Sequence, residues 1–273
     1  MRLDMAFLVF WKDWTEVRRN WQVVLPIVVL PLVFAVFIPA VFFLAADSVS
    51  GSTSSGEFDT LIRNLPLSVQ ADLAGMTATQ VMIYVMVLYF FAPFFLIIPI
   101  MASSVIASDS FAGEKERKTI EGLLATPLTD SELILGKILV SFVPSVIVTI
   151  VAFAAYSTSV DVLGYSLFGG RLLLPNVDWL MLVLGLAPIV SLTAIGLTVI
   201  VSARVRGFRE AQQISALLIL PVLVLLFAQA AGLIIFGPMV ILLLMVLFAA
   251  VDVVVFRVGL GLFRREEIVS RIS

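Results

Sequence analysis

The chain alternates between long apolar runs and short polar segments. Six uninterrupted apolar runs, each of about 20 residues or more, are long enough to cross the hydrocarbon core of a bilayer as helices. They cover residues 23–46, 81–107, 138–160, 179–202, 213–236 and 239–257. The pattern therefore predicts an all-α polytopic membrane protein with six transmembrane helices, built as one domain over residues 1–273.

Composition supports this class and excludes others. Hydrophobic residues make up 61% of the chain and charged residues 13%, whereas soluble proteins have about a quarter charged residues. Six spans leave little chain for a separate catalytic domain. The absence of cysteine and histidine removes disulfides, thiolate nucleophiles, the commonest general base and the commonest metal ligand. We expect no catalytic residue, no metal site and no cofactor in this chain.

The basic residues are sorted between the two sides of the predicted spans. If the amino terminus is cytoplasmic, only Arg63 and Arg171 lie outside. The inside segments then hold Arg2, Lys12, Arg18, Arg19, Lys115, Arg117, Lys118, Lys137, Arg204, Arg206, Arg209, Arg257, Arg264, Arg265 and Arg271. Because such a Lys/Arg bias over short loops sets orientation, we expect both termini, including the tail 258–273, to be cytoplasmic.

Residues 1–22 resemble a helix that lies in the membrane interface. One face of this helix carries apolar side chains at spacings of three and four, and the opposite face is polar. The apolar face comprises Phe7, Phe10, Trp11, Trp14, Val17 and Trp21, and the polar face Lys12, Asp13, Glu16, Arg19 and Asn20. Tryptophan suits the headgroup region, so the segment is predicted to anchor the chain there, with contact to a partner protein as the alternative.

Local signals refine two of the spans. Pro26, Pro31 and Pro39 each remove a backbone donor from the first span, which is therefore predicted to be kinked or locally open. Thr77 and Gln80 have the spacing of a capping box that begins the second span.

Residues 109–137 form a charged connector between the second and third spans. The sequence predicts a helix, a break before Pro127 and a second helix that begins with a capping box of Thr129 and Glu132. In the first helix the charged residues 114–118 are predicted to project towards water. The connector is thus a defined bend, although charges placed there also serve topology alone.

These residues resemble a known family. The run from Phe111 to Thr129, FAGEKERKTIEGLLATPLT, followed by Leu135-Gly-Lys137, closely resembles the signature of ABC-2 type permeases, the membrane subunits of one class of ABC transporter. Residues 10–20, 206–213 and 263–268 are similar to the interfacial helix, the later cytoplasmic connector and the terminal helix of that family. Nearly the whole chain is covered.

The resemblance implies a half-transporter in the plasma membrane, with residues 109–137 as its coupling helix. It would dimerise with a second copy or a paralogue and bind two ATP-binding subunits, which hold ATP and Mg²⁺; no nucleic acid is expected. Glu114 would correspond to the carboxylate that meets the ATPase, with Glu116, Arg117 and Glu121 nearby. The chain carries no phosphate-binding loop, so it is not expected to be an enzyme.

The cargo and its path are less defined. The family mostly exports, so export is favoured over import. Apolar and aromatic positions of the second and fifth spans, such as Phe91, Phe94 and Phe95, are candidates for the substrate path, although phenylalanine at helical spacing more often faces lipid or core.

Two further classes of function compete with this one. A secondary transporter or channel would need an ionisable group within the membrane, and only Asp252 qualifies; it could instead pair with Arg257 or Arg204. An intramembrane enzyme would need a His-containing motif, a nucleophile elbow or a second membrane aspartate, none of which the sequence contains.

Overall fold

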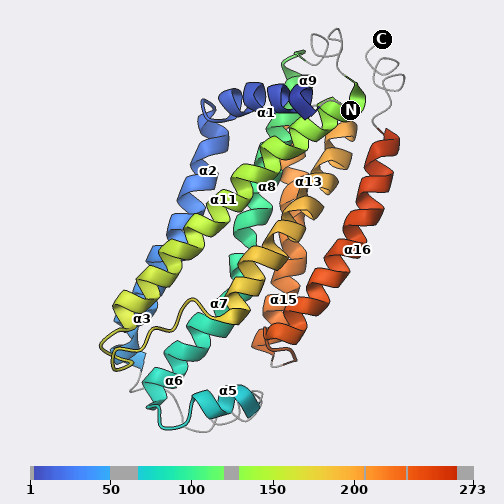
Figure 1. Ribbon diagram of the computed structural model, residues 1–273. Helices are drawn as coiled ribbons and strands as arrows, with labels where there is room; N and C mark the ends of the chain where they lie inside the picture. Colours follow the sequence, from blue (N-terminus) through green and yellow to red (C-terminus); the bar gives the residue numbers. More distant parts are fainter. Residues whose placement is uncertain (1–2, 50–66, 120–128, 206, 232, 263–273) are drawn as a thin grey trace.

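The computed structural model describes residues 3–49, 67–119, 129–205, 207–231 and 233–262, and within them it contains helices and no strands. These residues include six helical stretches long enough to cross a membrane, which confirms the predicted six-span, all-α fold. The stretches are Trp21–Ala45, Ala78–Glu116, Ser131–Gly164, Val177–Arg204, Phe208–Ala230 and Pro238–Gly259. They form one elongated bundle, and the described chain begins and ends at the same end of it (Figure 1).

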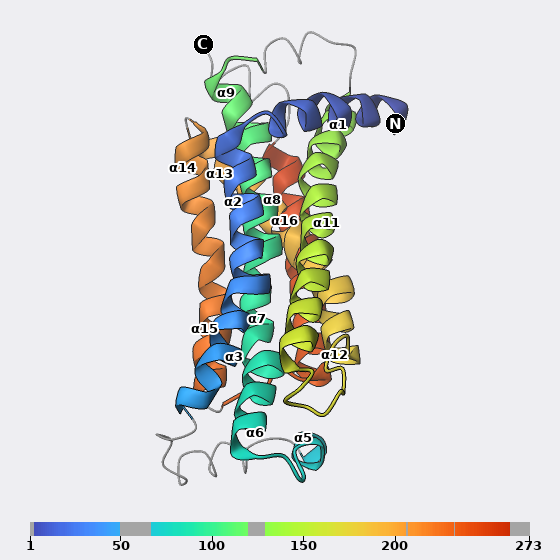
Figure 2. The same ribbon diagram turned by 90° about the vertical axis from the view of Figure 1, so that its left-hand side faces the viewer.

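Helix α1 (Leu3–Val17) lies across that end, which we call the α1 end (Figure 2). Its inner face buries Ala6, Val9, Asp13 and Val17. The sequence predicted Asp13 on a water-facing side, and this is wrong, because the acid points into the bundle, where other polar groups surround it. The opposite face is exposed and largely apolar, with Leu3, Phe7, Leu8 and Trp11.

The first span is irregular, as its prolines predict. It consists of α2 (Trp21–Leu32), a π-helical turn η1 (Val33–Phe37) and α3 (Ile38–Val49). The wider turn begins two residues after Pro31, which cannot donate a backbone hydrogen bond. A short helix, α5 (Leu67–Asp72), precedes the second span at the far end of the bundle (Figure 1).

The second span runs further than predicted. It comprises α6 (Ala78–Val85), η2 (Met86–Phe90), α7 (Phe91–Phe95), α8 (Ile97–Ser108), η3 (Asp109–Gly113) and α9 (Glu114–Glu116).

The capping box that begins this span is confirmed, since Thr77 N donates to Gln80 Oε1 at 2.7 Å and Gln80 N donates to Thr77 Oγ1 at 3.4 Å. No break separates this span from the predicted connector at 109, because the helix continues to Glu116. Residues 109–114 continue the helix and are buried, and the two acids among them are paired, Asp109 with Arg117 and Glu114 with Lys12.

The third span is α11 (Asp130–Gly164), and this helix includes residues 130–137 of the predicted connector. Its capping box is confirmed: Thr129 N donates to Glu132 Oε2 at 3.1 Å, and Glu132 N donates to Thr129 Oγ1 at 3.4 Å. The predicted break before Pro127 lies outside the described residues, as do Glu121 and most of the tail.

Of the remaining spans, the fourth and fifth are also segmented, whereas the sixth is one helix. The fourth comprises α12 (Val177–Leu180), η4 (Met181–Leu186) and α13 (Ala187–Arg204); the fifth comprises α14 (Phe208–Ser215), η5 (Ala216–Ile219) and α15 (Leu220–Ala230); the sixth is α16 (Pro238–Leu262). The fifth span ends at Ala230 and not at the predicted residue 236. The connection that follows is apolar, with Phe236 buried in the core, so hydropathy cannot distinguish it from helix.

The core lies around the second and fourth spans. In their most apolar windows 67% and 56% of residues are buried, against 17%, 22% and 22% in the first, fifth and sixth spans. Aromatic rings fill the half of the core away from α1, where Tyr156 and Trp179 stack at 4.9 Å. Tyr156 Oη donates to Val87 O at 2.7 Å, and Trp179 Nε1 donates to Leu88 O at 2.9 Å. Both carbonyls belong to η2, a turn whose backbone pairing is irregular.

Candidate functional site

Seven charged side chains gather at the α1 end, and we call them the charge cluster. They come from α1, from the end of the second span with the turn that follows it, and from the beginning of the third span. The members are Lys12, Asp13, Glu16, Asp109, Glu114, Arg117 and Lys137. The cluster therefore joins three segments that are far apart in the sequence.

Lys137 is the centre of the cluster. Its side chain is 2% exposed, and Nζ lies 2.5 Å from Glu114 Oε2 and 3.3 Å from Asp13 Oδ2, two carboxylates that are 1% and 3% exposed. The ammonium group also donates to Ser110 O at 2.5 Å, and it lies 5.4 Å from the centre of the Phe111 ring. A buried cation is tolerated only when it is paired and hydrogen-bonded in this way.

Lys12 closes the cluster on its solvent side. Its Nζ donates to Glu114 Oε1 at 2.5 Å and lies 3.4 Å from Glu16 Oε1. Nζ also lies 3.1 Å from Asp13 Oδ1, in ion-pair contact but without hydrogen-bond geometry. Burial acts to lower the pKa of Lys12, but the hydrogen bond to Glu114 and the charges of Asp13 and Glu114 outweigh it and raise the pKa above its ordinary value. Lys12 therefore stays charged throughout the physiological range.

Arg117 extends the cluster towards the corner between α1 and α2. Its Nη1 donates to Asp109 Oδ1 at 3.0 Å, and Nη2 lies 3.8 Å from Glu16 Oε2. Asn20, which caps α2 by accepting from Gln22 N, also donates to Asp109 Oδ1 at 3.2 Å. Burial acts to lower the pKa of Arg117, but the hydrogen bond to Asp109 and the neighbouring acids raise it.

Gly136 allows α1 to approach the third span closely. A Cβ atom at this position would lie 2.6 Å from Val9 Cβ and 2.7 Å from Ala6 O, which is closer than packed atoms allow. The glycine is next to Lys137, so the same helical turn provides both the close contact and the buried charge. The local sequence thus explains why α1 lies across α11 at this level (Figure 2).

Beyond the cluster, the end of α9 contacts the corner between the fourth and fifth spans. Lys115 Nζ donates to Val205 O at 3.0 Å, directly after α13, and Phe208 N, the first amide of α14, donates to Glu116 Oε2 at 2.8 Å. The chain then turns at Lys118, whose φ is 57°, with Thr119 N donating to Glu114 O at 3.0 Å.

Comparison with known families decides the class of protein. A family model described as "ABC-2 family transporter protein" matches residues 7–240, which is most of the chain. This chain belongs to the ABC-2 transporter family. No curated protein matches the transporter in sequence. The family and the six apolar helices together establish a multi-pass membrane protein that works in transport, in a family whose members generally act with ATP-binding subunits.

The structure places the predicted coupling residues differently from the sequence analysis. Glu114 does not project towards water, because both of its oxygens are bonded within the transporter. Glu116 and Arg117 are exposed but also have partners within the chain, and Glu121 lies outside the described residues. Direct contact of any of these residues with an ATPase stays a prediction.

The three phenylalanines proposed for the substrate path lie in the core of this transporter. Phe91 and Phe95 are buried, and Phe95 packs against Trp179 with ring centres 5.3 Å apart. Phe94 is partly buried and contacts Phe34 of the first span, with ring centres 6.0 Å apart. Whether they meet a substrate stays a prediction.

Asp252 has a neutral partner. Thr193 Oγ1 lies 2.5 Å from Asp252 Oδ1, which links α13 to α16. The sequence suggested a pair with Arg257 or Arg204, but in the part of the chain that the structure describes no ion pair includes Asp252. One intramembrane acid held by a hydroxyl group provides a contact between helices, and its role in transport stays a prediction.

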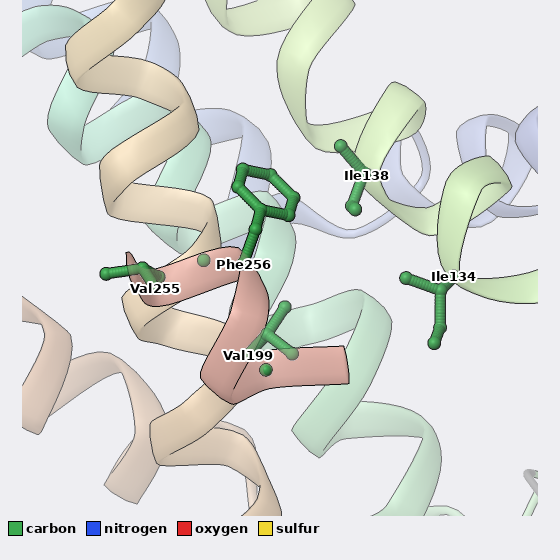
Figure 3. Close-up of a pocket in the computed structure, with 7 residues that line it drawn as sticks. Ile134, Ile138, Val199, Val255 and Phe256 are labelled. Atoms are coloured by element: carbon green, nitrogen blue, oxygen red, sulfur yellow. The ribbon is translucent and has the colours of Figure 1, made fainter. Parts of the chain in front are cut away.

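A small hollow lies between α11, α13 and α16 near the α1 end. Ile134 and Ile138 lie on one side of it, and Val199, Val255 and Phe256 on the other (Figure 3). Two glycines, Gly196 and Gly259, complete the lining. At Gly196 an added Cβ would lie 2.5 Å from Val255 Cγ1, so this glycine sets the close approach of α16 to α13. Because the lining is apolar, the hollow offers no group for catalysis or for binding a charged ligand.

Of the seven members of the charge cluster, only Glu114 and Arg117 were predicted as site residues; the other five, which include Glu16 and Asp109, were not. Lys12 and Asp13 were assigned to a solvated face, and Lys137 was assigned only to the cytoplasmic side. A usable signal existed for Lys137, since it stands in the apolar run Leu135-Gly-Lys-Ile-Leu139, where a lysine needs an acidic partner. The sequence contains no comparable signal that would identify Asp13 as that partner.

Proposed function

We propose that this chain is the membrane-spanning subunit of an ATP-driven exporter in the plasma membrane. It pairs with a second copy or a paralogue, and the pair binds two ATPase subunits at the α1 end. The ATPase subunits carry ATP and Mg²⁺. Their movement enters through the segment that begins at Glu114 and continues into the third span.

The observation that carries this proposal is the charge cluster at the base of that segment. The helix that ends in α9 and the helix α11 both run through the bundle, and Glu114 and Lys137 join them where they leave it. A force on the connecting segment is therefore applied to two spans at once. Rigid-body tilting of joined helices is one of the recognised ways in which a local push produces a change between two states.

Glu114 fits an internal role in this scheme. Its side chain is buried, whereas Arg117 and Lys118 at the turn beyond α9 are exposed. A partner that approaches the α1 end can contact these exposed cations directly. Glu114 then keeps the turn, α1 and the third span in one register, which is the established use of buried charged pairs.

The proposed pairing with a second membrane subunit is supported by the exposed apolar faces of peripheral spans. On the first span Leu25 and Leu32 are exposed, and on the fifth span Val224 and Phe227 are exposed. In a membrane such faces contact lipid or another subunit. Copurification of two differently tagged copies from cells that express both measures which chains pair.

The deciding experiment is purification of the tagged chain from its native membrane in mild detergent, followed by mass spectrometry. We expect a copurifying protein with a phosphate-binding loop and vanadate-sensitive ATPase activity. A chain that purifies reproducibly without any such protein would refute the proposal. Replacement of exposed Thr119 or Arg171 with cysteine in this cysteine-free chain tests orientation, because an impermeant reagent should label only the Arg171→Cys variant from outside.

A further inference from the structure

Lys115 and Glu116, at the end of α9, contact the two sides of the short connection between the fourth and fifth spans. Lys115 binds the carbonyl of Val205, where the fourth span ends, and Glu116 binds the amide of Phe208, where the fifth span begins. Only residues 205–207 separate α13 from α14. Figure 2 shows α9, α13 and α14 gathered at the α1 end. The second span therefore contacts the connection between two other spans through adjacent side chains.

The charges of these side chains match the helix ends that they contact. Carbonyl groups at the carboxyl end of a helix carry partial negative charge, and amides at the amino end carry partial positive charge. Lysine is thus placed at the end of α13 and glutamate at the start of α14. Gly207, the residue before α14, has no side chain of its own to cap the helix, so Glu116 supplies the missing acceptor from another part of the chain.

The backbone at Gly207 lies in close contact with the Glu116 carboxylate. A Cβ atom on Gly207 would lie 2.6 Å from Glu116 Oε2 and 3.0 Å from its carboxyl carbon, so a larger residue displaces the carboxylate. On the other side, α14 buries Phe208, Ala211 and Ser215. Ala211 belongs to one apolar group with Ala112 of the second span. The amide contact and the packing both fix the start of the fifth span to the end of the second.

We propose that Glu116 is a positioning residue that transmits movement from the connector between the second and third spans to the fifth span. This inference rests on the proposed function, which supplies the movement. It assigns Glu116 to a contact within the transporter and not to the ATPase surface. Lys115 adds a contact to Val205 at the end of the fourth span. The end of α9, the end of α13 and the start of α14 therefore move together when the segment beyond α9 is displaced.

The contact itself can be measured on the full chain in detergent by hydrogen–deuterium exchange. In Glu116→Ala we expect the first-turn amides of α14 to exchange on the order of fivefold faster, the usual effect of losing a cap. Gly207→Ala, which displaces the carboxylate without changing charge, should have the same effect. Glu116→Gln keeps an acceptor and should restore slow exchange. Asp4→Ala removes an exposed acid of α1 and should change nothing at α14.

Transmission is measured on the complex with its ATPase, with and without ATP and vanadate. We expect vanadate trapping to change exchange in α14 in the wild type and in Glu116→Gln, and to leave it unchanged in Glu116→Ala, although the ATPase remains bound. An equal response in Glu116→Ala would overturn the inference, as would release of the ATPase by that variant with exchange in α14 unaltered. The binding of the ATPase to the wild-type chain is measured first. If the wild-type chain binds no ATPase, the proposed function is refuted before any variant is compared.

Discussion

Loss of the charge on Lys137 gives the sharpest prediction. Lys137→Met keeps a long, flexible side chain but removes one of the two cations that contact Glu114 and Asp13. These two buried acids then contact only Lys12 among the cations of the cluster. Breaking a buried ion pair in this way typically costs about 3–5 kcal/mol, because one charge is left without compensation. We therefore expect the free energy of unfolding to fall by about this amount.

The assay is reversible unfolding in mixed micelles, followed by intrinsic tryptophan fluorescence, to which Trp11 and Trp14 of α1 contribute. Glu114→Gln should cost a similar amount. The double variant removes one charge of each sign, so it should cost about 1–3 kcal/mol less than the sum of the two single variants. This difference is the interaction free energy between Lys137 and Glu114.

The matched control is Lys115→Met, which removes a partly buried lysine of the same segment with one backbone acceptor. That change should cost about 1.5 kcal/mol or less. The reasoning would be refuted if Lys137→Met cost no more than the control. It would also be refuted if the two single losses added to within about 0.5 kcal/mol of the double variant.

Substitutions at three other positions test separate features by thermal unfolding in detergent. Gly136→Ala should destabilise the transporter by about 1–3 kcal/mol, because its methyl group meets Val9; wild-type stability would contradict this close contact. Lys118→Gly should stabilise it by about 1 kcal/mol, because φ is 57° there, and a loss of stability would count against the turn. Asp252→Asn, which keeps an acceptor for Thr193, should cost less than Asp252→Leu, and equal losses would show that the hydrogen bond does not matter.

The features that sequence predicted well are those with short-range causes. A bilayer requires long apolar helices, so six spans follow from hydropathy. The capping boxes at Thr77 and Thr129 follow from two residues three positions apart. The family signature depends on a contiguous run, which is why residues 111–129 are enough to indicate the class of transporter.

The charge cluster could not be predicted because its pairs are long-range. Lys12 and Glu114 are 102 residues apart, and Asp13 and Lys137 are 124 residues apart. Lys12, Asp13 and Glu16 have the periodicity of water-facing positions, and the apolar run around Lys137 shows that it needs a partner without showing which. Only the crossing of α1 over the third span brings them together, and a single sequence does not specify that crossing. For the same reason the apolar pattern, which ends at residue 107, does not show that the helix continues to Glu116.

The aromatic hydrogen bonds to η2 limit how the transporter can move. Hydrogen-bonded attachment points in both halves of a helix prevent it from tilting freely against its neighbours. The second span has such points: Lys137 holds it at the α1 end, and Tyr156 and Trp179 hold adjacent carbonyls in its other half from two different neighbours. The second span is therefore held to the third span in both halves and to the fourth span in the half away from α1. Relative motion during a transport cycle is therefore expected more at the boundary of these three spans with the first and sixth spans than among the three.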